Sequence, residues 1–151
     1  MVRNRTKCLE VARSCAVLNL RRAARAVTSR YEDEMRPLGL KATQFSLLVA
    51  AALRGPINVS QLAELMVMDR TTLTRNLKPL QKQGLLQVVP GRDRRTRAVT
   101  LTAAGEKMLE QALPLWEQAQ HTVVEGLGQE RFAWLLGDLQ QTVDVARNGG
   151  V

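Results

Sequence analysis

The sequence has little of what catalytic and metal sites are built from. Among its 151 residues are one histidine, two cysteines and five aromatic side chains. A lone histidine, His121, cannot form a zinc or iron site rich in imidazole, and two thiols do not make a disulfide framework. No Ser/His/acid set and no glycine-rich phosphate loop is present. We therefore expect a protein that is not an enzyme and that uses no metal and no cofactor.

Long hydrophobic runs and acidic excess are also missing. The longest apolar run covers the seven residues 47–53, whereas a membrane span needs about 20. Glu10 and Arg13 interrupt what would have to be a signal-peptide core, so a cytoplasmic location is expected. The chain has 22 Lys and Arg against 14 Asp and Glu, a net charge of +8. Such an excess favours a polyanionic partner, either nucleic acid or an anionic membrane surface.

The positive charge is concentrated in one segment. Residues 70–97 carry eight basic side chains and one acidic side chain, a net charge of +7. Residues 1–69 have a net charge of +5, and residues 98–151 have a net charge of −4. The partner of this protein is therefore expected to contact the middle of the chain.

Hydrophobic periodicity predicts a mainly helical single domain that becomes α+β through one hairpin. Helices are expected at 8–36, 43–53, 59–66, 70–83, 103–126 and 129–147, and strands at 85–89 and 97–101. The helices 59–66 and 70–83 are short and separated by about three residues, which is the helix-turn-helix arrangement.

The helix 70–83 has two contrasting faces. Leu73, Leu77 and Leu80 form a narrow apolar seam, because they fall within about 60° of one another at the helical period. The opposite face carries Thr71, Arg75, Lys78 and Lys82, and no carboxylate occurs between Arg70 and Gln83. Such a face can be an ordinary solvated surface, but the lack of any acidic residue favours a polyanion.

The predicted hairpin has an arginine-rich tip. Residues 90–96 contain the turn-forming Pro-Gly-x-Asp pattern. This tip carries Arg92, Arg94 and Arg95, and Arg97 opens the return strand. So many arginines repel one another unless a polyanion neutralises them, and a membrane surface would not need a hairpin. The pattern is typical of a winged helix-turn-helix protein, with a helix for the major groove of double-stranded DNA and a thin tip for the minor groove.

The terminal helices have longer apolar stripes than one small winged domain can cover. Pairing with a second copy is the simplest way to bury these stripes, and it would place two recognition helices about one DNA turn apart. We therefore expect a homodimer, with dimerisation helices at 1–36 and 103–151 and a DNA-binding lobe at 40–101.

Several motifs resemble the multiple-antibiotic-resistance regulator (MarR) family. They are the recognition-helix segment 69–86, the Asp93-Arg94-Arg95 wing, the segment 99–105 ending in Leu-Thr-Ala-Ala-Gly, and Leu38-Gly-Leu with Gln44. These motifs follow one another in the order and spacing of the family, and the similarity covers about residues 16–140. One departure is Lys41, where the family usually has a threonine that caps the next helix, and the loss of this cap costs about 1 kcal/mol.

This resemblance implies a homodimer that binds a pseudo-palindromic operator, usually as a repressor, and leaves it when a small ligand or an oxidant acts. It also implies that Arg95 enters the minor groove and that Asp93 holds the wing arginine. The full predicted DNA-binding set is Arg70, Thr71, Thr72, Thr74, Arg75, Lys78, Arg92, Asp93, Arg94, Arg95 and Arg97. Within it, the threonines and Arg75 would face the major groove, and Lys78 would contact phosphates.

The signal that releases the protein from DNA has two interpretations, a small ligand or an oxidant. Arg21, Arg22 and Arg25, with His121, could receive an anionic ligand such as an aromatic carboxylate, although solvation or pairing with an acid such as Glu32 is simpler.

Cys8 and Cys15 offer the redox alternative. Part of the family senses peroxides through a first-helix cysteine, whose position falls on Val17 here. On one continuous helix the two thiols would lie about 10 Å apart along the axis and could not form a disulfide with each other. Packing at a subunit interface is the simpler role for both. A non-specific architectural DNA-binding protein is a further alternative.

Overall fold

A computed structural model describes residues 4–91 and 96–148. Its helices are α1 (Arg5–Ser14), α2 (Ala16–Met35), the 3-10 helix η1 (Arg36–Leu38), α3 (Ala42–Arg54), α4 (Val59–Leu65), α5 (Arg70–Lys82), α6 (Ala103–Leu127) and α7 (Gln129–Asn148). Its strands are β1 (Ile57–Asn58), β2 (Leu86–Pro90) and β3 (Arg97–Leu101). The predicted mainly helical fold with one hairpin is confirmed, and the bounds from α3 onward agree with prediction to within one residue.

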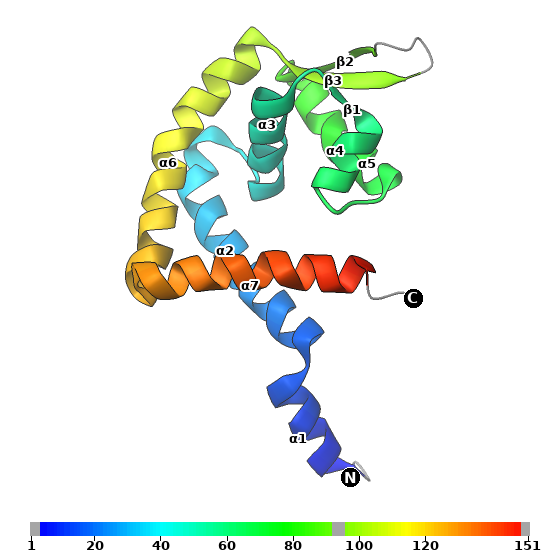
Figure 1. The fold of residues 1–151 in the computed structure, drawn as a ribbon. Coiled ribbons are helices and arrows are strands. Elements are labelled where there is room, and N and C mark those ends of the chain that lie inside the picture. Colours follow the sequence, from blue (N-terminus) through cyan, green and yellow to red (C-terminus); the bar gives the residue numbers. More distant parts are fainter. Residues whose placement is uncertain (1–3, 92–95, 149–151) are drawn as a thin grey trace.

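The three strands form a small antiparallel sheet in the order β1-β3-β2. The hairpin register pairs Leu86 with Leu101 at its base and Pro90 with Arg97 near its tip. Strand β1 was not predicted, because two residues are too short to show an alternating pattern. Figure 1 shows the hairpin at the opposite end of the molecule from α1.

The hydrophobic core lies inside the winged lobe, between α3, α4, α5, the sheet and the ends of α2 and α6. Its largest fully buried side chains are Met35, Leu47, Leu48, Leu62, Leu73, Leu80, Leu86 and Val99. This core holds α5 and the hairpin in one rigid unit, so that both surfaces point in defined directions.

The predicted continuous helix 8–36 is wrong in one respect. Cys15 has extended backbone angles (φ −70°, ψ 115°), and the chain breaks there into α1 and α2. The Cys15 carbonyl oxygen accepts both the Asn19 side-chain amide at 2.9 Å and the Asn19 main-chain N–H at 3.1 Å, which fastens the start of α2. Periodicity did not predict this break, because neither glycine nor proline marks it. Helix α1 projects away from the rest of the chain, with Cys8 on it (Figure 1).

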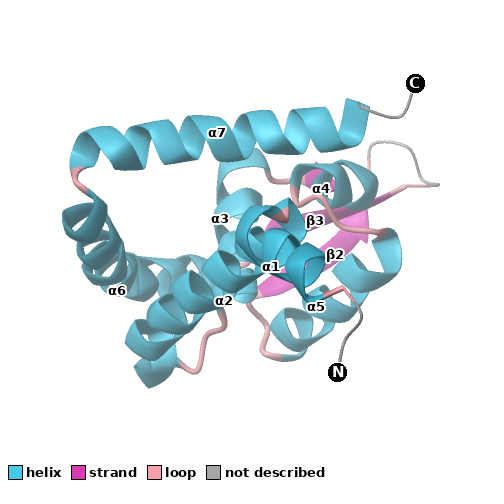
Figure 2. Ribbon diagram, turned by 90° about the horizontal axis from the view of Figure 1, so that it is seen from below, coloured by secondary structure: helices cyan, strands magenta, loops and turns pink. Residues whose placement is uncertain are grey.

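The last helix carries an apolar stripe that the single chain does not bury. Its periodicity places Phe132, Leu135, Leu136, Leu139 and Val143 on one side, but α7 has no buried residue. Its side chains are largely exposed, with Trp134 at 65% and Leu136 at 52%. Figure 2 shows α7 running past the rest of the molecule as a separate rod. The single chain therefore leaves this apolar stripe without a cover.

Helix α6 packs against α2 and leads from the winged lobe to α7. Ala112 and Ala119 are fully buried on it, and the Tyr31 hydroxyl on α2 donates to Gln120 Oε1 on α6. Burial raises the pKa of Tyr31.

Across the described parts of the chain, no helix has the length and hydropathy to cross a membrane.

Candidate nucleic-acid interface

Asp69 caps the start of α5. Asp69 Oδ1 accepts from the Thr72 main-chain N–H at 2.8 Å, and Oδ2 accepts from the Thr72 hydroxyl at 2.7 Å. These hydrogen bonds stabilise the charged carboxylate and lower the pKa of Asp69, the main-chain bond having the larger effect. Helix α5 ends at Lys82, and Gly84 follows its C-cap with a φ of +70°, a backbone conformation that favours glycine.

The two predicted faces of α5 are confirmed. Leu73, Leu77 and Leu80 are buried at 0%, 3% and 0% exposure. The exposed residues include Arg70, Thr71, Thr74, Arg75, Lys78 and Lys82, together with Pro79 and Gln81. This helix therefore presents cations and hydroxyls to the outside while leucines anchor it.

Two of the predicted threonines also have structural partners. Thr72 is half-buried, with its hydroxyl donated to Asp69. Thr74 is exposed, and its hydroxyl donates to the Arg70 carbonyl oxygen at 2.7 Å. Each hydroxyl oxygen can still accept a hydrogen bond, but Thr72 is the less accessible of the two.

The turn between α4 and α5 sets the direction of the recognition helix. The Met68 N–H donates to the Ala63 carbonyl at 2.9 Å, and the Val67 N–H donates to the Glu64 carbonyl at 3.1 Å. This pair of bonds is a Schellman motif, in which the residue of positive φ is usually glycine. Here it is Val67, with φ +51°.

Ser60 joins the two helices from the side. Asn58 Oδ1 caps α4 by accepting from the Ser60 N–H at 2.8 Å, and the Arg70 guanidinium donates to the Ser60 hydroxyl oxygen. Sequence patterns did not single out Ser60, because the contact depends on how α4 and α5 are placed.

The wing is the hairpin of β2 and β3, and Arg97, the first residue of β3, is exposed. Between α5 and the strands lies an open groove of about 470 Å³, with Arg70 and Thr74 on the helix side and Arg97 on the strand side. Arg92, Asp93, Arg94 and Arg95 lie outside the described residues, so their roles stay predictions. Helix α5 and the base of the wing thus line one groove, with Arg70 and Arg97 on its two sides.

The start of α6 is fastened to the end of the recognition helix. The Thr102 hydroxyl donates to the Gly84 carbonyl at 2.6 Å and accepts from the Gly105 N–H at 3.0 Å. A Cβ at Gly105 would lie 2.1 Å from the Leu85 carbonyl oxygen, so only glycine fits this close approach. The Leu-Thr-x-x-Gly pattern is thereby explained, because its threonine and glycine hold the start of α6 against the residues that lead into the wing.

The candidate effector residues lie on two helices, α2 and α6. Arg21, Arg22 and Arg25 are exposed on α2, and Glu32 pairs instead with Lys41 at 3.1 Å. His121 is exposed on α6, where its Nε2 lies 3.3 Å from Glu125 Oε1.

The two thiols are both free. Cys8 is exposed, and Cys15 is half-buried at the break between α1 and α2. Their roles, like those of the arginines and His121, stay predictions.

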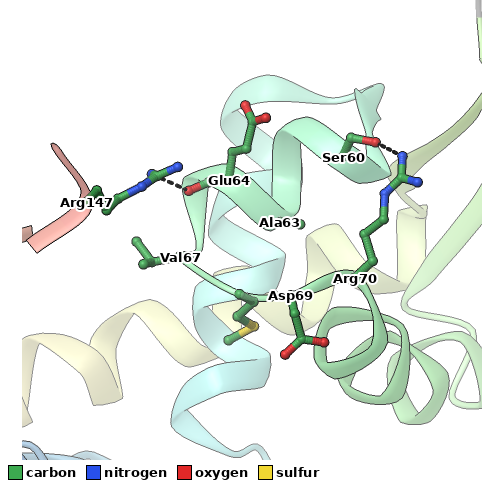
Figure 3. A pocket seen from close by; sticks show the side chains of 8 residues that line it. Ser60, Ala63, Glu64, Val67, Asp69, Arg70 and Arg147 are labelled. Atoms are coloured by element: carbon green, nitrogen blue, oxygen red, sulfur yellow. Dashed lines mark hydrogen bonds between the residues drawn. The ribbon is translucent and has the colours of Figure 1, made fainter. Parts of the chain in front are cut away.

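Sequence reasoning also missed Arg147. Its guanidinium, near the end of α7, donates to the Glu64 carbonyl oxygen at 3.4 Å (Figure 3). Nothing in the local pattern of α7 predicts this contact, because the two residues are 83 positions apart.

A helix-turn-helix followed by a basic wing defines a winged-helix DNA-binding protein, and comparison with known proteins places it more closely. The family model described as "MarR family" matches residues 40–96. The transcriptional regulator MosR of M. tuberculosis, in a crystal structure with DNA, is 38% identical with a TM-score of 0.78, over 89% of this chain and 99% of that one. This chain belongs to the MarR family of transcriptional regulators.

Two further relatives extend the comparison. The transcriptional regulator HosA of Escherichia coli O157:H7 is 29% identical over 86% of this chain and 98% of that protein. BpsR of Bordetella bronchiseptica, whose DNA binding is regulated by 6-hydroxynicotinic acid, is 25% identical, with a TM-score of 0.76 over 88% of this chain and 96% of that one. These relatives are regulators, and this chain is a DNA-binding transcriptional regulator of the same family.

Proposed function

We propose that this regulator is a homodimeric repressor that reads a pseudo-palindromic operator in double-stranded DNA and leaves it when a small anionic aromatic ligand binds. The observation that carries the proposal is the exposed face of α5, which presents Arg75 and Lys78 with no carboxylate between Arg70 and Lys82. A surface of this kind lowers its own electrostatic repulsion when it neutralises DNA phosphates.

The proposed contacts divide into reading and positioning. Thr71, Thr74 and Arg75 face the major groove, where arginine and hydroxyl groups match base edges. Lys78 contacts phosphates. Thr72 belongs with the reading set through its hydroxyl oxygen only, since its proton is donated to Asp69. Arg95 enters the minor groove and Asp93 holds it, and the cations Arg70, Arg92, Arg94 and Arg97 complete the proposed DNA-binding set.

The dimer is supported by the apolar side chains that the single chain leaves exposed. Leu135 and Leu139 on α7 are each 38% exposed, and Val17 on α2 is 65% exposed. A second copy that pairs with these helices would remove the stripes from water, which is the main favourable term in association. Residues 1–36 and 103–151 then form the dimerisation part, and residues 40–101 form the DNA-binding lobe.

The ligand class is supported by the arginines of α2 and by one relative. Arg21, Arg22 and Arg25 are exposed on the single chain and offer guanidinium groups that bind carboxylates in a bidentate manner. His121 on α6 is a second candidate contact. BpsR is regulated by 6-hydroxynicotinic acid, an aromatic acid. We infer that a ligand of this chemistry weakens operator binding here.

The test begins with DNA fragments selected by the purified protein from its source genome. On the recovered site, Arg95→Ala should weaken binding by about 2–3 kcal/mol while sedimentation still shows a dimer. Lys78→Ala should reduce the slope of log affinity against log salt by about one phosphate contact. Arg131→Ala, which removes an exposed arginine from α7, is the control for loss of one positive charge.

Two outcomes would contradict the proposal. An unchanged affinity in Arg95→Ala would remove the wing from the interface. In competition at moderate salt, a protein with no preference for the selected site over bulk DNA would be an architectural protein instead.

A second candidate for the trigger is oxidation of a thiol. It is favoured by the position of Cys15 at the break between α1 and α2, and by the exposure of Cys8. Peroxide should then weaken operator binding of the natural chain and leave Cys15→Ser unaffected, with Cys8→Ser as the matched variant. Equal loss in the natural chain and in a variant that combines Cys8→Ser with Cys15→Ser would exclude a thiol switch.

A further inference from the structure

The last turn of α7 reaches the turn of the helix-turn-helix. Arg147 Nη1 lies 3.4 Å from the Glu64 carbonyl oxygen, to which it donates. Beside this contact is an open pocket of about 600 Å³ whose walls come from α4, the α4–α5 turn, the start of α5 and Arg147. Figure 3 shows Arg147 and Arg70 on opposite sides of this pocket. Helix α7 therefore contacts α4, next to the turn that leads into α5, through the hydrogen bond of Arg147.

The acceptor of this hydrogen bond belongs to the most strained part of the turn. The Glu64 carbonyl also accepts from the Val67 N–H at 3.1 Å, and Val67 has φ +51°. A branched residue in this conformation is held only by the bonds around it. The positively charged Arg147 side chain donates to the same carbonyl oxygen. This hydrogen bond further stabilises the turn conformation that sets the direction of α5.

Helix α7 is held near both of its ends and is open in the middle. It follows α6 directly after Gly128, and Arg147 contacts α4 at the other end. Between these points Leu136 is 52% exposed and Leu139 is 38% exposed. Arg147 therefore links the open stretch of α7 to the helix that leads into the turn.

We propose that Arg147 is a positioning residue for DNA binding: by holding the Glu64 carbonyl oxygen, it couples the position of α7 to the position of the recognition helix α5. The proposal rests on α5 being the DNA-reading helix of the proposed function. Arg147 acts through the turn and not by touching DNA, which separates it from Lys78 and Arg75.

The first measurement is operator affinity by fluorescence anisotropy at several salt concentrations. Arg147→Ala should weaken binding about fivefold, as expected for one lost charged hydrogen bond, and leave the salt slope unchanged. Arg131→Ala on the same helix is the matched control and should stay within about twofold. Arg147→Lys keeps a charged donor and should recover part of the loss. Sedimentation of each variant verifies that the dimer is retained.

The second measurement examines the turn without DNA. In Arg147→Ala, the Val67 and Met68 amides should exchange with solvent about five times faster, because their opening is less costly. A double-mutant cycle with Val67→Gly tests the mechanism. Once glycine relieves the strain, removal of Arg147 should weaken operator binding by less than about twofold.

Each outcome decides the proposal. Equal affinity and equal amide exchange in Arg147→Ala and Arg131→Ala would overturn it. A salt slope reduced by about one in Arg147→Ala would make Arg147 a phosphate contact and would also overturn it. If the natural chain shows no preferred DNA site, the proposed function fails, and the amide exchange alone still decides whether Arg147 holds the turn.

Discussion

Val67 occupies a position where a branched side chain is unfavourable. Its φ of +51° lies in the left-handed region, in the turn that joins α4 to α5. An L-residue pays about 1–2 kcal/mol there, more than the conformational entropy that glycine adds to the unfolded chain. Strain of this kind is often kept at functional turns.

Replacing Val67 with glycine should therefore stabilise the protein. The free energy of unfolding in urea, at fixed protein concentration, should rise by about 1 kcal/mol in Val67→Gly. The control position is Val145, which lies inside α7 and is 63% exposed, close to the 57% of Val67. Val145→Gly should lower the free energy of unfolding, because glycine weakens a helix interior. A loss of stability in both variants would show that Val67 is not strained.

Asp69 links the stability of the recognition helix to pH. Hydrogen bonds from Thr72 lower the pKa of Asp69 in the folded state. Its contribution to stability is thus fully present above the ordinary aspartate pKa and is lost as the pH falls through the lowered folded value.

The measurement is the melting temperature across the acid range, from about pH 5 to pH 3. Asp69→Asn keeps a capping oxygen but does not titrate, so its melting temperature should fall less steeply with acid than that of the natural chain. Asp138→Asn on α7 controls for the loss of one carboxylate. Identical acid profiles for the natural chain and Asp69→Asn would contradict the assignment of the cap.

One residue shows why capping cannot always be judged from local sequence. Lys41 stands where a capping threonine is usual, and a weaker start of α3 was expected. In the structure, Glu32 from α2 accepts from the Ala42 N–H at 3.3 Å and pairs with Lys41. Gln44 also accepts from the Lys41 N–H at 2.9 Å. The missing cap is replaced by a carboxylate from another helix, which local spacing does not reveal.

At the scale of elements, the junction between α6 and the wing depends on Gly105. Thr102 caps α6 and also donates to the Gly84 carbonyl at the end of the recognition helix. Gly105 allows α6 to approach Leu85 closely enough for both bonds to form. The beginning of α6 therefore fixes where α5 ends and β2 begins.

Two glycines of α6 should respond in opposite ways to alanine. Gly105→Ala places a Cβ 2.1 Å from a main-chain oxygen, so the free energy of unfolding should fall by about 2 kcal/mol. At Gly126 an added Cβ meets nothing within 4 Å, and alanine should stabilise the helix by up to about 1 kcal/mol. Chemical denaturation measures both, and a neutral Gly105→Ala would mean that the joint relaxes freely.

The helices differ in how well sequence predicted them. α5 was predicted with its bounds and both faces, because its apolar seam, Asp69 and Gly84 are all local signals. The break at Cys15 and the two-residue strand β1 were not, because neither has a signal in the pattern. Whether α7 is buried also depends on what lies beside it, which periodicity alone does not specify.

At the scale of the whole molecule, the proposed dimer makes a geometric prediction about its operator. Two copies of α5 related by a twofold axis would meet the major groove about one helical turn apart, or 10–10.5 base pairs. Five base pairs inserted between the half-sites rotate one half-site to the far side of the duplex. Affinity should then fall by about a hundredfold or more.

The control is the same insertion outside the operator, which should leave affinity unchanged. An operator that tolerates insertion between its half-sites would mean that the two lobes bind independently. That result would contradict a dimer held by rigid terminal helices.

The sequence by itself determined the class of this protein, because the features that carry it are local. The charge of residues 70–97, the leucine seam of α5, its cap and the hairpin pattern each depend on neighbours a few positions away. Only the tertiary structure decided which residues join distant segments: Glu32 at the start of α3, Gly105 against Leu85, and Arg147 against Glu64. These contacts follow from how the helices pack, and packing depends on the whole chain at once.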